Sequence, residues 1–308
     1  MADIVIAEFM DEATLHSAFR GLDVLYDPKL VDKPGALIAA VADARALVVR
    51  NRTQVNASLL DSAPHLTVVG RLGVGLDNID MDACKARRIA VFPATGANDQ
   101  SVAEYVITAM LVLLRRAWFA KDLVIAGQWP RMSSIGREIA AKRLGLIGFG
   151  GIARQVAARA RALGMRIAAY DPFIGAEEPL WAQAERLSLP ELLRLSDVVS
   201  LHVPLTTDTY HIIDAAALAT MPASAILINT ARGGVIDEKA LVTALRDGRI
   251  SGAALDVFEK EPVDAASGAH FAGVPNLLLT PHIAGVTAES NLRVSAATAE
   301  AVLRHLRH

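Results

Sequence analysis

Three polar residues in the second half of the chain follow apolar runs and together offer one kind of chemistry. Arg232 lies in "INTARGG", Glu261 in "DVFEKEP" and His282 in "TPHIAG". A planar guanidinium can grip a carboxylate and polarise a neighbouring carbonyl, while an imidazole takes a proton from a hydroxyl as hydride leaves the same carbon. A carboxylate on the other imidazole nitrogen fixes its tautomer and raises its pKa. The set therefore favours oxidation of a 2-hydroxy acid to a 2-oxo acid.

Each of these residues also has a simpler interpretation when it is taken alone. Arg232 could lie on the surface, Glu261 could belong to a loop before Pro262, and His282 could merely end a strand. Their positions argue for one site, because ligands of open α/β sheets bind beyond the carboxyl ends of the strands. Arg232 and His282 follow their apolar runs immediately, and Glu261 lies in a loop that can approach the same crevice.

A glycine-rich turn in "LGLIGFGGIARQVAARARALG" is typical of dinucleotide binding. Gly148, Gly150 and Ala153 have the G-x-G-x-x-G/A spacing after an apolar strand and at the start of a helix. Gly148 permits the tight turn, Gly150 lets backbone amides approach a pyrophosphate at the helix N-terminus, and Ala153 allows close packing. Such a turn also occurs for purely structural reasons, so the surrounding elements must show whether this one binds a dinucleotide.

An acid in the expected place supports the cofactor interpretation. The strand "RIAAY" ends in Asp171, twenty-one residues beyond Gly150, where a carboxylate would bind an adenosine ribose. Pro172 and Phe173 offer no cation for a 2′-phosphate, so the sequence favours NAD over NADP. The alternative is that Asp171 only caps the turn before Pro172.

The elements that must position these residues form two alternating series. Short β-branched runs such as "DIVIAEF" and "ALVVRN" alternate with helical stretches, and a second series starts at "RLGLIGFG". This alternation predicts βαβ units around mostly parallel sheets. Between the series we expect a long helix from near Asp99 or Ser101, where "SVAE" has capping-box spacing, to about Phe119. A last amphipathic helix is expected from about Thr287.

Composition narrows the class of protein. With 308 residues and 53% hydrophobic residues the chain can fill two cores, and its net charge of −2 shows no basic footprint for nucleic acid or a membrane anchor. Cys84 is the only cysteine, which favours a reducing, cytoplasmic setting. The densest apolar run, Val106 to Leu114, is too short for a bilayer. We predict no metal site.

Motifs over nearly the whole chain are similar to one family. The segments "VVGRLGVGLDNID", "SVAEYVI", "LGLIGFGGIA", "AAYDP", "LHVPLT", "LINTARGGVIDEKALVTAL", "GAALDVFEKEP" and "LLLTPHIAG" occur in family order. The sequence resembles the D-isomer-specific 2-hydroxyacid dehydrogenases, most closely the 3-phosphoglycerate dehydrogenase branch, in a short form without the regulatory domain. Feedback control by serine is therefore not expected.

The resemblance implies a fold of two doubly wound, parallel-sheet α/β domains. A Rossmann NAD-binding domain, residues 99–283, would be inserted in a flavodoxin-like substrate-binding domain formed by residues 1–98 and 284–308. It also implies a homodimer that forms through the NAD-binding domain. The apolar helix from Ser101 to Phe119 is a candidate surface for that contact, although the same helix could simply belong to the core.

The resemblance also assigns roles to individual residues. Arg232, Glu261 and His282 carry over as the catalytic trio, with His282 as acid and base. Val74 and Gly75 of "GVG" would offer amides to the substrate carboxylate, and this segment is equally interpretable as a tight turn. The implied cofactor contacts are Gly148, Gly150, Gly151, Ile152, Asp171, Val203, Pro204, Thr230, Ala231, Asp256 near the nicotinamide amide, and Gly285.

Two arginines bear on which hydroxy acid is used. Arg50 in "VVRNRT" and Arg131 in "GQWPRM" align with arginines near the phosphate in phosphoglycerate dehydrogenases. Planar donors from two segments suit an anionic group on C3, which favours 3-phosphoglycerate or 3-sulfolactate over lactate or glycerate. Alternatively, Arg50 serves the carboxylate and Arg131 lies on a solvated surface. Formate is disfavoured, because Glu261 stands where formate dehydrogenases have glutamine.

Two other functions remain open at this level. The chain could be a glyoxylate or hydroxypyruvate reductase that works mainly towards reduction. It could also resemble the NAD-binding co-repressors that share this scaffold, in which case NADH would bind without useful turnover of any 2-oxo acid. The intact catalytic trio favours an enzyme.

Overall fold

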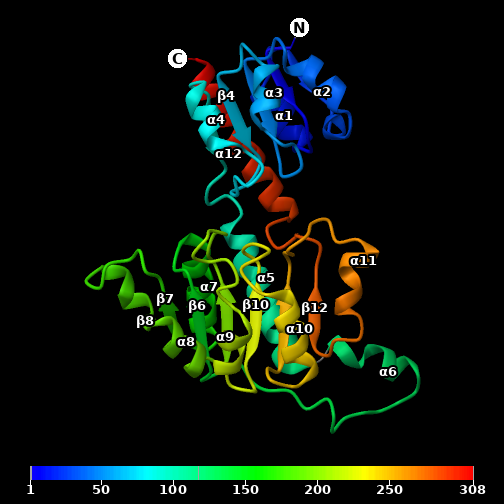
Figure 1. The fold of residues 1–308 in the computed structure, drawn as a ribbon, viewed down its shortest axis with the longest axis vertical. Coiled ribbons are helices and arrows are strands. Elements are labelled where there is room, and N and C mark those ends of the chain that lie inside the picture. The colour runs from blue at the N-terminus through cyan, green and yellow to red at the C-terminus, as the bar shows by residue number, and fades with distance from the viewer. Residues whose placement is uncertain (1, 117, 308) are drawn as a thin grey trace. The chain divides into compact units, whose positions relative to one another are not determined.

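The computed structural model describes residues 2–116 and 118–307. The chain divides into two compact units, each of which is described by itself. The terminal unit comprises Met1–Asn98 and Val286–His308, and the central unit comprises Asp99–Gly285. Each unit is a parallel sheet flanked by helices (Figure 1), so the predicted α/β fold class is confirmed.

The terminal unit has a five-stranded parallel sheet in the order β2-β1-β3-β4-β5. Its strands are β1 (Ile4–Ile6), β2 (Val24–Tyr26), β3 (Ala46–Val49), β4 (Val68–Arg71) and β5 (Ala90–Pro93). This is the flavodoxin-like order, in which the chain reverses direction beside the first strand. Every residue of β1 and β3 is buried, as expected of strands that helices cover on both faces.

Helices cover both faces of this sheet. One face packs against α1 (Glu12–Ala18) and α12 (Ala288–Leu306), whose Leu15 and Val302 are buried. The other face packs against α2 (Pro34–Val41), α3 (Ala57–Asp61) and α4 (Met81–Ala86), together with the short η1 (Leu30–Asp32). Segments from both ends of the chain therefore build one core.

The central unit has a seven-stranded parallel sheet in the order β12-β11-β10-β9-β6-β7-β8. Its strands are β6 (Arg143–Ile147), β7 (Arg166–Tyr170), β8 (Glu185–Arg186), β9 (Val198–Leu201), β10 (Ile226–Asn229), β11 (Gly252–Leu255) and β12 (Leu277–Leu279). This is the Rossmann order with one added strand, and its switch point lies between β6 and β9. Ligands of such sheets bind at the carboxyl ends of the strands, next to the switch point.

Two layers of helices enclose the central sheet (Figure 1). Helices α5 (Asp99–Arg115) and α7 (Gly151–Ala162) cover one face, and α8 (Leu189–Leu195), α9 (Ala215–Thr220) and α10 (Glu238–Arg246) cover the other. Shorter turns complete the unit: η2 (Trp118–Ala120), α6 (Lys121–Ile125), η3 (Pro179–Gln183), α11 (Ala265–Gly268) and η4 (Ala269–Phe271).

The predicted long helix forms, with different ends. Helix α5 begins at Asp99, so Ser101 lies inside its first turn and is not the N-cap that the "SVAE" spacing indicates. It ends at Arg115, and a separate turn begins at Trp118; residue 117 lies outside the described residues. Because Val106, Met110, Leu113 and other residues of one face are buried in the core of the central unit, α5 is a core helix.

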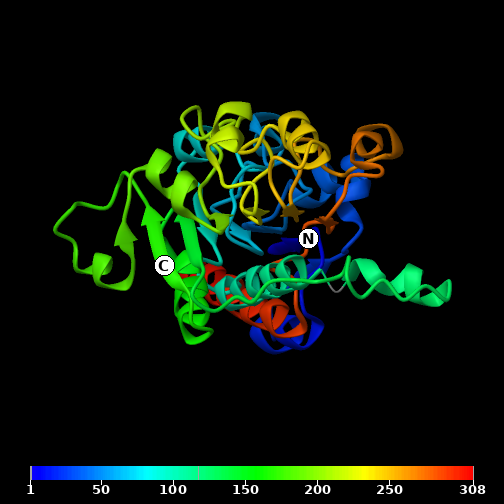
Figure 2. The same ribbon diagram turned by 90° about the horizontal axis from the view of Figure 1, so that it is seen from below.

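An apolar segment follows α5. We name residues 118–135 the α6 arm. It exposes Trp118, Ile125, Trp129, Met132 and Ile135, of which Trp129 and Met132 are 76% and 80% exposed. Helix α6 extends away from the sheet of its own unit in both views (Figures 1 and 2). Among the described residues no helix combines the length and apolar character needed to cross a bilayer.

Candidate active site

His282 and Glu261 form a hydrogen-bonded pair. Nδ1 of His282 lies 2.7 Å from Oε2 of Glu261, and Oε1 of the same carboxylate accepts a hydrogen bond from the Phe258 amide at 2.9 Å. Partial burial acts to raise the pKa of Glu261, but the bonds from His282 and Phe258 and the charges of His282 and Arg232 outweigh it and lower that pKa. Since Nδ1 donates to the carboxylate, Nε2 of the neutral imidazole is left as a proton acceptor.

The backbone at His282 is held in an uncommon conformation. Its φ of 57° lies in the left-handed region, which bulky residues rarely adopt unless their surroundings impose it. Asp256, which follows β11, imposes it here: Oδ1 accepts from Thr280 Oγ1 at 2.6 Å and the Ile283 amide at 2.8 Å, and Oδ2 accepts from the Ala284 amide at 2.7 Å. Asp256 is only 1% exposed, and burial raises its pKa despite these bonds.

Arg232 follows the neighbouring strand, β10, in a turn closed by Asn229. Oδ1 of Asn229 accepts from the Ala231 amide at 3.0 Å, and its Nδ2 donates to the Arg232 carbonyl at 2.9 Å. Gly233 lies so close to the Phe258 carbonyl that any side chain there would collide with it. The loops after β10 and β11 are therefore in contact, and Arg232, Glu261 and His282 follow three adjacent strands, β10, β11 and β12.

The glycine turn has the space and the groups to hold a dinucleotide. Gly148 has a φ of +85° and approaches the His202 carbonyl, where a side chain would clash. Gly150, the N-cap of the twelve-residue α7, faces open space. Thr230 Oγ1 is buried and, within the described residues, has no hydrogen-bond partner. A helix N-terminus of this kind suits a pyrophosphate, and the orphaned Thr230 hydroxyl, two strands further along the same sheet edge, is available to another part of the cofactor. These residues therefore fit NAD.

Asp171 lies beside this turn, at the end of β7. Its Oδ2 accepts from the Phe149 amide at 2.9 Å and its Oδ1 accepts from the Phe173 amide at 3.0 Å. The second bond closes the turn through Pro172. Asp171 therefore also caps this turn, which is the simpler role that the sequence left open. The side chain is half-buried, which leaves part of the carboxylate accessible for a ribose.

The other sequence-predicted cofactor residues lie around the same carboxyl edge of the central sheet. His202, next to Val203, is half-buried; its loss of solvation lowers its pKa to about 4, and Ser200 Oγ lies 3.0 Å from its Nε2. A histidine held neutral in this way adds no charge beside the glycine turn. By their positions in the chain the remaining residues belong to this edge: Gly151 and Ile152 in the first turn of α7, Val203 and Pro204 after β9, Ala231 after β10, and Gly285 after the His282 turn.

In the terminal unit, Arg50 follows β3 and its backbone is fixed by Glu8. The Glu8 carboxylate, buried in the core, accepts hydrogen bonds from the amides of Arg50 and Thr53 at 2.8 Å and 3.0 Å. The Arg50 guanidinium donates to Asn291 Oδ1 at 3.0 Å, and burial lowers its pKa.

Sequence reasoning missed a second arginine at the same edge. Arg71 is the last residue of β4 and pairs in register with Val49, the residue before Arg50. The signal was available, because "VVGRLG" has an arginine at the end of its apolar run as "VVRNRT" does. Val74 and Gly75 follow in the loop after β4, half-buried, beyond a Gly73 with a φ of +144°.

Arg131 lies elsewhere in the central unit than His282. The α6 arm rejoins the unit where the strands begin: the Arg137 amide donates to the Leu114 carbonyl at 2.8 Å, and its side chain donates to the Ser224 carbonyl, just before β10. His282 lies at the opposite, carboxyl ends. Helix α5 has 17 residues and spans about 25 Å between these two ends. The structure therefore does not bring Arg131 to the histidine of its own chain.

Among the residues that the structure describes, no group of three or more His, Cys, Asp or Glu side chains is arranged to hold a metal ion. The site is instead built from an Arg, a Glu and a His at one edge of a dinucleotide-binding sheet. That combination performs proton and hydride transfer at a hydroxyl carbon.

Comparison with known proteins agrees with this geometry. Residues 107–284 match the model of the D-isomer specific 2-hydroxyacid dehydrogenase, NAD binding domain. A solved D-lactate dehydrogenase from Aquifex aeolicus, complexed with NAD and lactic acid, superposes with a TM-score of 0.87 at 30% identity and covers 99% of this chain and 95% of its own.

Relatives of known name extend the match over the full chain. An (S)-sulfolactate dehydrogenase of Chromohalobacter salexigens is 52% identical over 307 residues, 99% of each chain. A hydroxypyruvate reductase of Thermotoga maritima is 40% identical over 88% of this chain and 87% of its own. A D-3-phosphoglycerate dehydrogenase of Archaeoglobus fulgidus is 37% identical, but this chain spans only 56% of its length. The chain belongs to the D-isomer-specific 2-hydroxyacid dehydrogenase family and is an NAD-dependent enzyme of that family.

Proposed function

We propose that the enzyme interconverts a C3-sulfonated or C3-phosphorylated 2-hydroxy acid and its 2-oxo acid, with 3-sulfolactate as the first candidate. The observation that carries this proposal is a pair of arginines at the carboxyl ends of adjacent strands of the terminal unit: Arg50 follows β3, and Arg71 ends β4. Two guanidinium groups that come from the same edge of a sheet suit an oxyanion with three oxygens. Similarity to the sulfolactate dehydrogenase favours a sulfonate over a phosphate.

The proposed chemistry follows from the residues at the ends of β10, β11 and β12. In the oxidative direction Nε2 of His282 takes the hydroxyl proton, and Glu261 stabilises the imidazolium through Nδ1. Arg232 pairs with the substrate carboxylate and with the C2 oxygen. Bound NAD supplies the hydride acceptor for C2. In the reductive direction the imidazolium returns its proton to the same oxygen.

We further propose where the ligands are held. The central unit is the NAD-binding domain and the terminal unit the substrate-binding domain. Gly148 to Ile152, Val203, Pro204, Thr230, Ala231, Asp256 and Gly285 would contact the cofactor, with Asp171 on the adenosine ribose. Amides of Val74 and Gly75 would bind the substrate carboxylate, and Arg50 with Arg71 the group on C3.

A homodimer is the assembly that we propose, with the α6 arm at its interface. Its exposed tryptophans and Ile125 form an apolar surface that a soluble monomer rarely shows. Because Arg131 lies on this arm, at the end of the central unit away from His282, its proposed role in substrate binding requires the site of a second copy. A cytoplasmic location is also proposed, since Cys84 is a buried free thiol.

Initial rates of NADH oxidation test the substrate. The 2-oxo acids are 3-sulfopyruvate, 3-phosphohydroxypyruvate, hydroxypyruvate, glyoxylate and pyruvate, each with wild type and with Arg71→Ala. The proposal expects the highest kcat/KM with 3-sulfopyruvate, and a loss of about a hundredfold in the variant for the anionic substrates only. A highest kcat/KM with hydroxypyruvate, unchanged in Arg71→Ala, would instead support a hydroxypyruvate reductase, the activity named for the 40% identical relative. NADH binding without turnover of any of them would support a co-repressor-like protein.

A further inference from the structure

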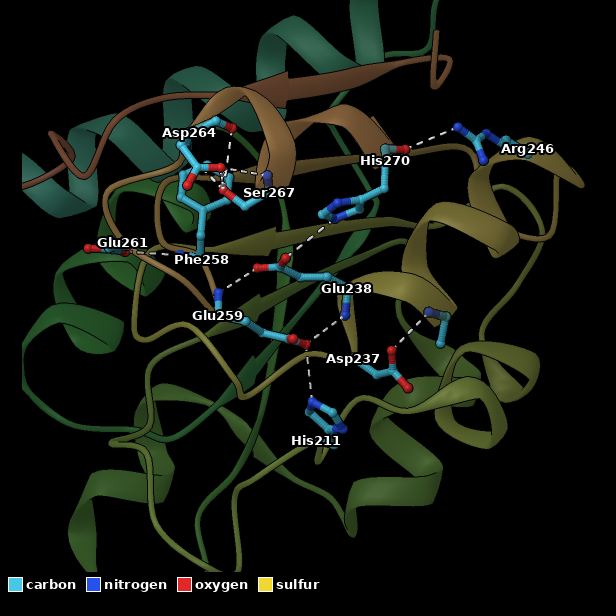
Figure 3. A network of polar contacts seen from close by, with 11 residues as sticks. His211, Asp237, Glu238, Arg246, Phe258, Glu259, Glu261, Asp264, Ser267 and His270 are labelled. Atoms are coloured by element: carbon cyan, nitrogen blue, oxygen red, sulfur yellow. Dashed lines mark hydrogen bonds and ion pairs between the residues drawn. The ribbon is translucent and has the colours of Figure 1, made fainter. Parts of the chain in front are cut away.

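Glu238 and Glu259, which have no role in the chemistry above, join the start of α10 to the loop after β11 (Figure 3). The Glu259 amide donates to Glu238 Oε1 at 2.6 Å, and the Glu238 amide donates to Glu259 Oε1 at 3.2 Å. Glu238 is the first residue of α10, and Glu259 lies in the loop after β11. We name this reciprocal pair of bonds the glutamate clasp.

The clasp is buried on one side. Glu238 is 7% exposed, and burial together with the Glu259 charge raises its pKa, although the Glu259 amide and His270 act against this. A buried carboxylate is costly unless its hydrogen bonds are well formed. Of its partners, the Glu259 amide makes the shortest bond, and that amide belongs to the loop that carries Glu261.

Two histidines border the clasp. His211 Nε2 lies 3.1 Å from Glu259 Oε1, and its ring stacks on Tyr210. His270 Nε2 lies 3.5 Å from Glu238 Oε2, and Arg246 donates to the His270 carbonyl at 3.0 Å. These contacts come from segments on either side of the loop after β11 (Figure 3), so the loop is fixed between them.

The loop connects the clasp to the active site through two consecutive amides. The Phe258 amide donates to Glu261 Oε1, and the next amide, that of Glu259, donates to Glu238 Oε1. Because the two amides are joined by one residue, a shift of the second displaces the first. The Phe258 bond in turn orients the Glu261 carboxylate, whose other oxygen contacts His282.

We propose that Glu238 is a positioning residue for the His282–Glu261 pair, and that it acts by holding the Phe258–Glu261 loop through the Glu259 amide. This proposal rests on the proposed catalytic role of that pair. The property that matters is a side-chain oxygen at position 238 that accepts the hydrogen bond from the Glu259 amide. Glu238→Gln, which keeps an oxygen acceptor, should retain most of the activity, and Glu238→Ala should not.

The test compares Glu238→Ala and Glu238→Gln with Asp237→Ala as the matched control. Asp237 is the adjacent N-cap of α10 and accepts from the Ala240 amide, so its loss weakens the same helix without touching the clasp. Each holoenzyme is measured with NADH well below its own Tm. The readouts are kcat, KM and the pH profile of kcat/KM in the oxidative direction, with the concentration of sites taken from NADH titration.

The expected result is a loss of kcat of about tenfold or more in Glu238→Ala, with little change in the KM for NAD. The pH profile of its kcat/KM should differ from that of the wild type and resemble that of Glu261→Gln, because in both variants the carboxylate no longer contacts Nδ1 of His282 in the same way. Asp237→Ala should lower Tm and leave kcat and the pH profile unchanged.

Two outcomes would overturn the proposal. One is a Glu238→Ala enzyme whose kcat and profile match those of Asp237→Ala. The other is a Glu238→Gln enzyme that loses as much kcat as Glu238→Ala. Failure of the proposed function is recognised separately, since His282→Ala would then keep its activity whatever Glu238 does.

Discussion

Nδ1 of His282 lies 2.7 Å from Oε2 of Glu261, and this one bond decides which imidazole nitrogen is free to react. A carboxylate can only accept, so Nδ1 carries the proton and Nε2 is the base. The same bond stabilises the charged imidazole and lowers the pKa of Glu261.

Replacing Glu261 with glutamine should therefore impair catalysis without removing the contact. The amide can donate to Nδ1 and select the tautomer whose Nε2 already carries a proton. We expect kcat to fall by about 10²-fold to 10⁴-fold. Because His282 loses its anionic partner, the pH profile of kcat/KM for oxidation should differ from that of the wild type. Steady-state rates from pH 5 to 10 check this, with the exposed Glu12→Gln as control. An unchanged profile would show that the pair does not act as a unit.

Asp256→Asn should affect both stability and rate. The carboxylate accepts three bonds in the turn around His282, and an amide must present its nitrogen to at least one of those donors. A buried donor left facing another donor costs about 1–3 kcal/mol. Unfolding in urea should show this loss, and kcat should fall because the left-handed backbone at His282 is released. Since the folded pKa of Asp256 is raised, its ionisation disfavours folding as the pH rises above the unfolded pKa, and Asp256→Asn should remove that part of the pH dependence.

Thr230→Val should weaken NADH binding without weakening the fold. Within the described residues the buried Oγ1 of Thr230 has no hydrogen-bond partner, so a methyl group in its place loses nothing in the cofactor-free protein. Bound cofactor would lose one hydrogen bond, which corresponds to a Kd about 2-fold to 12-fold higher. Fluorescence titration with NADH and thermal unfolding measure the two effects. Thr243→Val, on the exposed side of α10, is the control. A lowered Tm with unchanged Kd would contradict a cofactor role.

Ile125→Glu should turn the proposed dimer into a monomer. Ile125 is 73% exposed on the α6 arm, so a charge there costs the isolated chain little but would be buried without a partner at an interface. Light scattering after size exclusion gives the mass. Leu22→Glu, an exposed leucine of the terminal unit, is the control. Equal masses for wild type and Ile125→Glu would remove the arm from the interface.

A mixed dimer then tests whether Arg131 acts across subunits. Coexpressed Arg131→Ala and His282→Ala chains, each inactive alone, should regain about a quarter of the wild-type activity if random pairing unites one intact arginine with one intact histidine. If a verified mixed dimer regains no activity, Arg131 is a surface residue without a role in substrate binding.

The sequence predicts much of the architecture because its signals are local. Alternating runs indicate both sheets, the glycine spacing locates the turn at Gly148, and the strand-end rule identifies Arg232, Glu261 and His282. Long-range partners are not encoded in this way. Nothing in the pattern around Asp256 shows that its carboxylate holds a turn that begins 24 residues later, or that Glu238 and Glu259 bond to each other.

The outward side chains of the α6 arm were unpredictable for another reason. Hydrophobicity in the sequence indicates burial in the core, and it does so correctly for Val106 and Met110 of α5. Trp129 and Met132 are also hydrophobic, yet both are exposed to solvent in their own chain. The position of Arg71 at the end of an apolar run is visible in the sequence, but only the register with Val49 shows that this arginine lies beside Arg50.

The turn held by Asp256 has a consequence for anyone who would graft this active site onto another dinucleotide-binding scaffold. A histidine placed after the last strand of such a scaffold would leave the left-handed conformation, and its imidazole would lose the orientation that it has here. The transplant must carry Asp256, the Thr280–Ala284 turn and the Glu261 loop as one cassette, in which a residue that never meets the substrate sets the direction of the one that does.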